Sequence, residues 1–120
     1  MDKTMNTTHL AVDISRLNEI SDGDSEFENE LILMFLEDCP QRFTTLQGAV
    51  TLMNWELIRK EAHGLKGASG NMGANQMQFL AAAVEKAPEE TTSEEILRSF
   101  EALCDEYARV ESFFRAHLDR

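Results

Sequence analysis

The longest apolar pattern in this 120-residue sequence runs from Phe27 to Val50, and its spacing constrains the fold more than any other feature. Apolar residues recur every three or four positions, which places them on one side of an α-helix. They are Phe27, Leu31, Phe35, Cys39, Phe43, Leu46 and Val50. Pro40 removes one backbone hydrogen bond but does not interrupt the apolar pattern. The sequence therefore predicts one kinked helix to about Leu52, roughly 40 Å long. Two separate helices are the alternative.

Three further segments show the same periodicity, and residues that end helices separate them. Asn54 is suited to cap a helix over residues 55–72, which Gly73 should end as its C-cap. A third helix should cover residues 74–86, before Pro88, and a fourth should run from residue 93 to near 117. No strand pattern competes with these helices. The expected fold is all-α, an antiparallel up-down four-helix bundle.

Short polar signals mark where the helices begin. Ser25 with Glu28, and Thr92 with Glu95, have the spacing of a capping box, in which two side chains and two backbone amides bond reciprocally. Asp13 can cap a short helix over residues 14–20, which is too short to be stable alone and should dock on the bundle as an N-terminal lid. We expect a disordered N-terminal segment over residues 1–11 and one domain over residues 12–120.

Charge and composition exclude several classes of function. The net charge is −11, which argues against binding to nucleic acid or to an anionic membrane surface. No apolar run approaches the roughly 20 residues of a membrane span and no signal-peptide pattern is found, so a cytoplasmic protein is expected. Cys39 and Cys104 are isolated and should be reduced and partly buried. The spacing of histidines and acids predicts no metal site, and no ATP-binding motif is found.

His63 falls almost opposite the apolar stripe of its predicted helix and is therefore expected on a polar face. Lys60 and Lys66 lie three residues to either side, and Gly67 lies four residues after it, at spacings that bring groups together on a helix surface. Two more glycines, at positions 64 and 70, accompany Gly67. Each glycine costs about 1 kcal/mol in a helix interior. We infer that a partner surface approaches this histidine closely.

The residues His63-Gly64-Leu65-Lys66-Gly67-Ala68-Ser69, followed by Gly73-Ala74, resemble the H-x-L-K-G-[SA]-[SA] … G-A signature of histidine-containing phosphotransfer (HPt) domains. Two upstream segments are also similar to that family: Phe35-Leu36-Glu37-Asp38-Cys39-Pro40 in the preceding predicted helix, and Trp55-Glu56 at the start of the helix that carries His63. The resemblance extends from about Val12 to the C-terminus. It implies the same helical bundle that the periodicity predicts.

The resemblance also implies a function. His63 would take a phosphoryl group from a receiver-domain aspartate, or from a sensor kinase, and pass it to a response-regulator aspartate. The implied partners are receiver domains and a hybrid sensor histidine kinase, and Mg²⁺ would come from the receiver. The chain would be a phosphocarrier without kinase activity of its own, and we expect a monomer. The implied supporting residues are Lys66 and Lys60 for charge, Gly67, Gly64 and Gly70 for docking, and Glu85 for orienting the imidazole.

Two classes of function remain open, a phosphocarrier and a helical adaptor that docks a partner without phosphate. An intact His63 between two lysines favours the phosphocarrier. The other two histidines are assigned no role. His9 lies at the edge of the polar N-terminal segment, and His117 lies in the last turn of its predicted helix, where a cationic residue suits the helix dipole.

Overall fold

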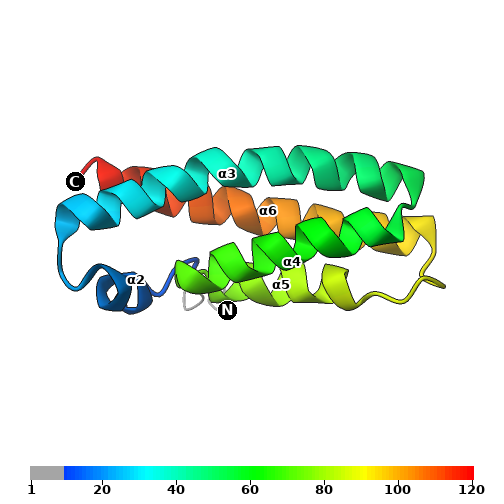
Figure 1. The fold of residues 1–120 in the computed structure, drawn as a ribbon, viewed down its shortest axis with the longest axis horizontal. Helices are drawn as coiled ribbons and strands as arrows, with labels where there is room; N and C mark the ends of the chain where they lie inside the picture. Colours follow the sequence, from blue (N-terminus) through cyan, green and yellow to red (C-terminus); the bar gives the residue numbers. More distant parts are fainter. Residues whose placement is uncertain (1–9) are drawn as a thin grey trace, which may run out of the picture.

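The computed structural model describes residues 10–120, and those residues form five α-helices and no strand (Figure 1). The helices are α2 (Ile14–Ser21), α3 (Ser25–Leu52), α4 (Trp55–Asn71), α5 (Asn75–Lys86) and α6 (Ser93–Leu118). The four long helices run alternately in opposite directions, and both α3 and α5 pack against α4 and α6. The predicted up-down four-helix bundle is confirmed, with α2 docked on α3 and α4.

The ordered domain begins earlier than the sequence indicated. Ala11 and Val12 are buried in the core, whereas Leu10 is exposed. The expected disorder is therefore wrong for Ala11, because two adjacent apolar side chains can anchor the chain without any periodic pattern. Residues 1–9, including His9, lie outside the described residues, so the expectations for them stay predictions.

Three of the four predicted N-terminal caps are confirmed. Asp13 accepts a hydrogen bond from a backbone amide in the first turn of α2, and Asn54 does the same for α4. Thr92 and Glu95 form a complete capping box at the start of α6, with distances of 3.1 and 3.0 Å. These side chains satisfy amides that have no partner within their own helix.

The predicted capping box of Ser25 and Glu28 is wrong. Asp24 caps α3 instead, its carboxylate accepting from the amide of Phe27 at 3.1 Å. A carboxylate is a charge-bearing acceptor that the positive end of the helix dipole favours, so it replaces the serine hydroxyl. Glu28 is consequently free to turn inward, where it meets His117 on α6.

The connection between α4 and α5 also holds α2 in place. Met72 is the C-cap of α4, and Gly73, predicted as that cap, is the next residue, with φ of +76°. The amide of Asp13 donates to the carbonyl oxygen of Gly73 at 2.7 Å. A Cβ atom at position 73 would collide with the carbonyl oxygen of Asp13. Glycine is therefore required here both for the backbone conformation and for the approach of α2.

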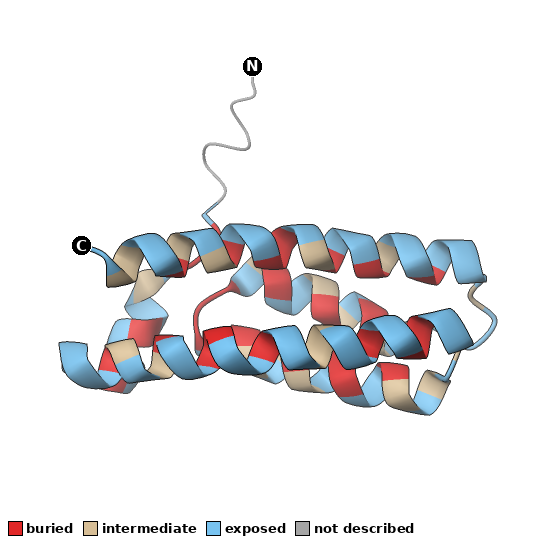
Figure 2. Ribbon diagram, turned by 90° about the horizontal axis from the view of Figure 1, so that it is seen from above, coloured by how far each residue is buried: buried red, intermediate tan, exposed pale blue. Residues whose placement is uncertain are grey.

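Buried positions line the inward-facing sides of the helices (Figure 2). Helix α3 continues through Pro40 as one element, as the unbroken apolar pattern predicted. Aromatic rings join α3 to α6, with the centroids of Phe35 and Phe114 5.6 Å apart. Both cysteines are free thiols, and burial raises the pKa of Cys39 to about 12, so that it stays protonated. The core therefore fixes α4 with its polar face outward.

Candidate functional site

His63 projects from the outward face of α4, with its side chain 69% exposed. The opposite face of the same helix carries Ile58, Ala62 and Leu65, each fully buried. The 3.6-residue period of the helix separates these positions from His63, so burial of the apolar stripe turns the imidazole into solvent. The predicted position of His63 on the polar face is confirmed.

The ring of His63 is held from one side by α5. Its Nδ1 lies 2.8 Å from Oε2 of Glu85, a residue that is largely buried, with 21% of its side chain exposed. An ionised carboxylate only accepts hydrogen bonds, so the ring hydrogen is on Nδ1. In the neutral ring, the lone pair is then on Nε2, the nitrogen left free by this contact.

Glu85 contacts a second group of the site. Its other oxygen, Oε1, lies 2.7 Å from Nζ of Lys66. The Lys66 ammonium, together with the hydrogen bond from His63, holds the pKa of the Glu85 carboxyl below its ordinary value, although partial burial opposes the shift. Glu85 is therefore ionised near neutral pH and joins the imidazole to the ammonium.

Two further cations lie one turn before His63 on α4. Lys60 is exposed and forms no ion pair with any residue between 10 and 120. Arg59 reaches the loop that follows α5, where its guanidinium lies 3.0 Å from the carboxylate of Glu89. Sequence reasoning missed Arg59, although its position four residues before His63 places it on the same side of the helix.

The three glycines of α4 have different surroundings. A Cβ atom added at Gly67 would meet nothing within 4 Å. At Gly64 it would collide with the guanidinium of Arg42, and at Gly70 it would lie 2.5 Å from the carboxamide nitrogen of Gln78. Side chains of the same chain therefore cover two of these glycines, and of the three only Gly67 presents bare backbone to solvent. The docking role of all three stays a prediction.

The side chain over Gly64 belongs to a network between α3 and α4. The guanidinium of Arg42 lies 2.9 Å from Asp38 and 3.2 Å from Glu61. Glu61 is buried among apolar neighbours, so it needs this partner to offset the loss of hydration. Gly64 provides the space in which Arg42 reaches it.

An exposed apolar surface lies on the α3 side of α4. Phe27 and Met34 are 41% and 65% exposed on α3, and Leu31 lies between them at helical spacing. Leu31 and Met34 line a groove of about 410 Å³ together with Ala68 of α4 and Met72, the C-cap of that helix, which is itself buried. We call these five residues the apolar patch. The groove gives this flank of α4 a small apolar surface.

Residues 10–120 contain neither a membrane span nor a metal site. None of the helices there has the length and apolarity needed to cross a bilayer. No cluster of three or more histidine, cysteine, aspartate or glutamate residues in the same range could hold a metal ion. The arrangement around His63 is thus a nucleophilic imidazole with one nitrogen anchored, a cation beside it and open backbone one turn away.

A four-helix bundle that presents such an imidazole agrees with the architecture that the resemblance to histidine phosphotransfer domains implied. Residues 30–113, more than half of the chain, match the Hpt domain family. The chain therefore belongs to the Hpt domain family. Members of this class carry phosphoryl groups on a histidine in phosphorelays, are phosphocarriers rather than kinases, and work with phosphorelay kinases and response regulators.

Two known proteins illustrate the similarity. Histidine-containing phosphotransfer protein 2 of Arabidopsis thaliana is 23% identical over 94 residues, which are 76% of this chain. The chain spans 60% of the length of that curated relative. The crystal structure of histidine-containing phosphotransfer protein B from Pseudomonas aeruginosa PAO1 superimposes with a TM-score of 0.80 at 23% identity, covering 89% of this chain and 93% of that one. This second similarity supports the fold.

Proposed function

We propose that His63 accepts a phosphoryl group from the aspartate of a receiver domain, or from a sensor kinase, and passes it to the aspartate of a response regulator. The observation that carries the proposal is the contact between Nδ1 of His63 and Glu85 at 2.8 Å. It leaves the exposed Nε2 as the nucleophile. Exposure matters because the donor and acceptor are both parts of other proteins, which must reach the same atom in turn.

The chemical step follows from this arrangement. The lone pair of Nε2 attacks the phosphorus of the aspartyl phosphate, the bond from phosphorus to the aspartate oxygen breaks, and its electron pair stays on the departing carboxylate. The ring keeps its Nδ1 hydrogen and gains positive charge, which the Glu85 carboxylate stabilises. Transfer to the second aspartate is the same reaction reversed.

Charge on the transferred group requires a cation. Lys66 lies three residues after His63 and, through Glu85, is held beside the ring. It can turn from Glu85 toward the phosphoryl oxygens once His63 carries the group, with Lys60 giving more distant support. Mg²⁺ and the acidic pocket that holds it would be supplied by the receiver, and the chain itself would supply neither ATP binding nor a metal.

Docking would use the surface around the histidine. Gly67 offers bare backbone one turn from His63, and the apolar patch lies on the adjacent flank of α4. Together they provide the combination of close approach and apolar area that a transient protein interface needs. A receiver seated there would have its aspartate over Nε2.

The test is transfer of labelled phosphate from a phosphorylated receiver in the presence of Mg²⁺. The label should appear on this chain, survive base and be lost in acid, as phosphohistidine requires. Incubation with labelled ATP and no other protein should give no label. If no receiver in a panel transfers phosphate, while at least one still binds, the chain is an adaptor rather than a phosphocarrier.

A further inference from the structure

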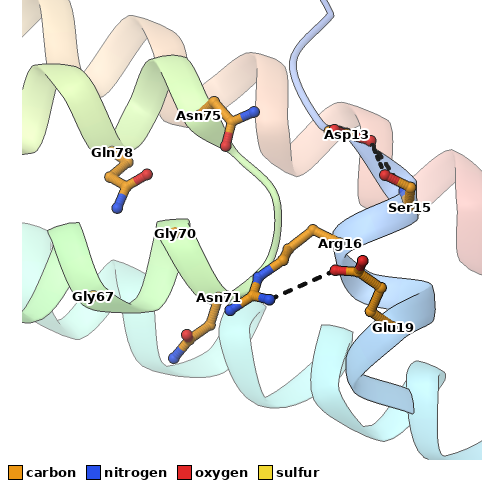
Figure 3. Close-up of a pocket in the computed structure, with 9 residues that line it drawn as sticks. All are labelled: Asp13, Ser15, Arg16, Glu19, Gly67, Gly70, Asn71, Asn75 and Gln78. Carbon is orange, nitrogen blue, oxygen red and sulfur yellow. Dashed lines mark hydrogen bonds and ion pairs between the residues drawn. The ribbon is translucent and has the colours of Figure 1, made fainter. Parts of the chain in front are cut away.

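A second cavity lies beyond Gly67 and is polar, in contrast to the apolar patch. Its volume is about 580 Å³, and it is an open hollow bordered by α2, the last turns of α4 and the first turn of α5 (Figure 3). Five of the residues that line it are Arg16 of α2, Gly67 and Asn71 of α4, and Asn75 and Gln78 of α5. We call this cavity the polar pocket. None of its side chains contacts the imidazole of His63.

Three carboxamides in the polar pocket have unused hydrogen-bonding capacity. The side chains of Asn71, Asn75 and Gln78 bond to no other residue between 10 and 120, and all three are exposed. Figure 3 shows the Gln78 carboxamide over Gly70 and the Arg16 side chain extending from α2 toward Asn71. Each carboxamide offers two donor hydrogens and one acceptor oxygen. The pocket is thus lined with groups suited to peptide groups and polar side chains.

Arg16 is available for a new partner. Its guanidinium lies 3.6 Å from Glu19, one turn later on α2, and both side chains are more than half exposed. An exposed pair at this distance contributes little free energy and is readily exchanged. Glu19 also lines the pocket, and the second carboxylate there, that of Asp13, is already committed to the cap of α2 through Ser15. A partner's carbonyl or carboxylate oxygen can therefore recruit Arg16 at small cost.

The position of the polar pocket decides which partner would fill it. Gly67 lines the pocket and lies one turn from His63, and Gly70 lies about two turns, or roughly 10 Å, from the histidine along α4. A standard interface covers about 800 Å² on each partner, a disc of roughly 16 Å radius. Any protein of that footprint centred on His63 must therefore cover the pocket mouth.

We propose that the polar pocket is a specificity site for the receiver domain, in which Arg16 and Gln78 hydrogen-bond a polar loop of the receiver beside the phosphoryl-transfer centre. This inference rests on the proposed function. The apolar patch would accept many apolar surfaces, whereas donors and acceptors reject a partner that leaves them unpaired. The two surfaces flank α4. The apolar patch would supply buried apolar area, and the polar pocket would discriminate among receivers.

The experiment uses the full chain with the double substitution Arg16→Ala and Gln78→Ala, compared with Gln47→Ala, an exposed carboxamide on the distant half of α3. Transfer from each phosphorylated receiver of a panel is measured at varied receiver concentration. For the receiver that the wild-type chain prefers, we expect KM to rise about tenfold, equivalent to about 1.4 kcal/mol. Its kcat should change less than twofold, and Gln47→Ala should behave as wild type.

Selectivity is the second readout. The ratio of kcat/KM between the preferred receiver and the others should fall, because disfavoured receivers gain nothing from the pocket. An unchanged KM and an unchanged ratio would overturn the specificity site while leaving the proposed function intact. A loss in kcat with KM unchanged would also overturn it, since the residues would then act on His63 rather than on docking. If the wild-type chain accepts phosphate from no receiver, both proposals fail.

Discussion

Two histidine–glutamate pairs in this chain have nearly the same geometry and very different surroundings. Nδ1 of His63 lies 2.8 Å from Glu85, and Nε2 of His117 lies 2.7 Å from Glu28. The side chain of His63 is 69% exposed and that of His117 is 14% exposed. One pair connects neighbouring helices α4 and α5, and the other connects the start of α3 to the end of α6.

Under the proposed function, the two pairs differ in access rather than in pairing with a carboxylate. The ring of His117 stacks on Phe113, with centroids 6.2 Å apart and planes 10° from parallel, and Glu28 is also close to Arg120. Nε2 of His117 is thus occupied by Glu28, and little of the side chain is open to another protein. At His63 the carboxylate holds the inner nitrogen and leaves the outer one exposed. Access to the second nitrogen separates a nucleophile from a structural contact.

The largest expected effect is on phosphorylation. His63→Gln should abolish the acid-labile label, because the nucleophile is gone, whereas His117→Gln should keep it, because its ring faces the core. Both variants are compared with wild type in the receiver transfer assay, with helical content checked by circular dichroism. Loss of label in His117→Gln, with the fold intact, would show that the buried pair takes part in transfer.

The second largest effect on the transfer rate is expected at Gly67, which leaves the backbone bare one turn from His63. Gly67→Gln should slow transfer from a receiver at least tenfold, since a displacement near 1 Å can cost about a hundredfold in a position-sensitive reaction. Gly67→Ala should leave the melting temperature level or raise it, because glycine is unfavourable inside a helix and the position is open. The transfer rate and the melting temperature are measured on the same two variants. If both variants transfer phosphate at the wild-type rate, the receiver does not approach over Gly67.

The two pairs should contribute unequally to the free energy of unfolding. His117→Ala leaves the carboxylate of Glu28, whose side chain is 6% exposed, without its closest partner, and should lower the free energy of unfolding by about 1–3 kcal/mol. His63→Ala should stay within about 0.5 kcal/mol of wild type, because the site is exposed. Urea unfolding of both variants measures the difference. Equal losses would mean that the exposed pair is also a major stabilising contact.

The His63 pair should also have its own pH dependence through Glu85. A carboxyl whose pKa is lowered in the folded protein stabilises the fold above its ordinary value of 4.5 and loses that contribution as the pH falls through the lowered value. The stability difference between wild type and Glu85→Gln should therefore be constant near neutral pH and shrink on acidification below about pH 4. Urea midpoints across this range provide the measurement, and a difference that persists at about pH 2 would contradict it.

The smallest expected effect belongs to Lys66. An exposed charge pair contributes about 0.2–1 kcal/mol, so Lys66→Ala should shorten the phosphohistidine lifetime or slow transfer by a few-fold. The effect should weaken as salt rises, because the interaction is screened. Lifetimes in about 50 mM salt that match wild type would remove Lys66 from the site, and Arg98→Ala, at an exposed cation on α6, serves as the control.

The structural features that could be predicted from the sequence are those that depend on neighbouring residues within one helix. The helices, most of their caps and the exposed position of His63 follow from periodicity and short-range spacing. The contact of Glu85 with His63 could be expected only by resemblance, because it depends on the register between two helices. Glu28 illustrates the limit most clearly: its spacing to Ser25 indicated a cap, while its actual partner lies 89 positions away. Such pairings are set by packing of the whole core, which local pattern does not encode.

The hydrogen bond between the Asp13 amide and the Gly73 carbonyl has a consequence for how long the polar pocket exists. Helix α2 has eight residues, so it is not stable by itself and depends on attachments such as this one. Segments of this kind open locally at a free energy below that of global unfolding. Arg16 then lines the polar pocket only in molecules whose α2 is docked. A receiver that binds in the pocket would have an affinity reduced in proportion to the fraction of such molecules. Helix α2 would thereby tune partner choice through its own opening equilibrium, without any change in the bundle that presents His63.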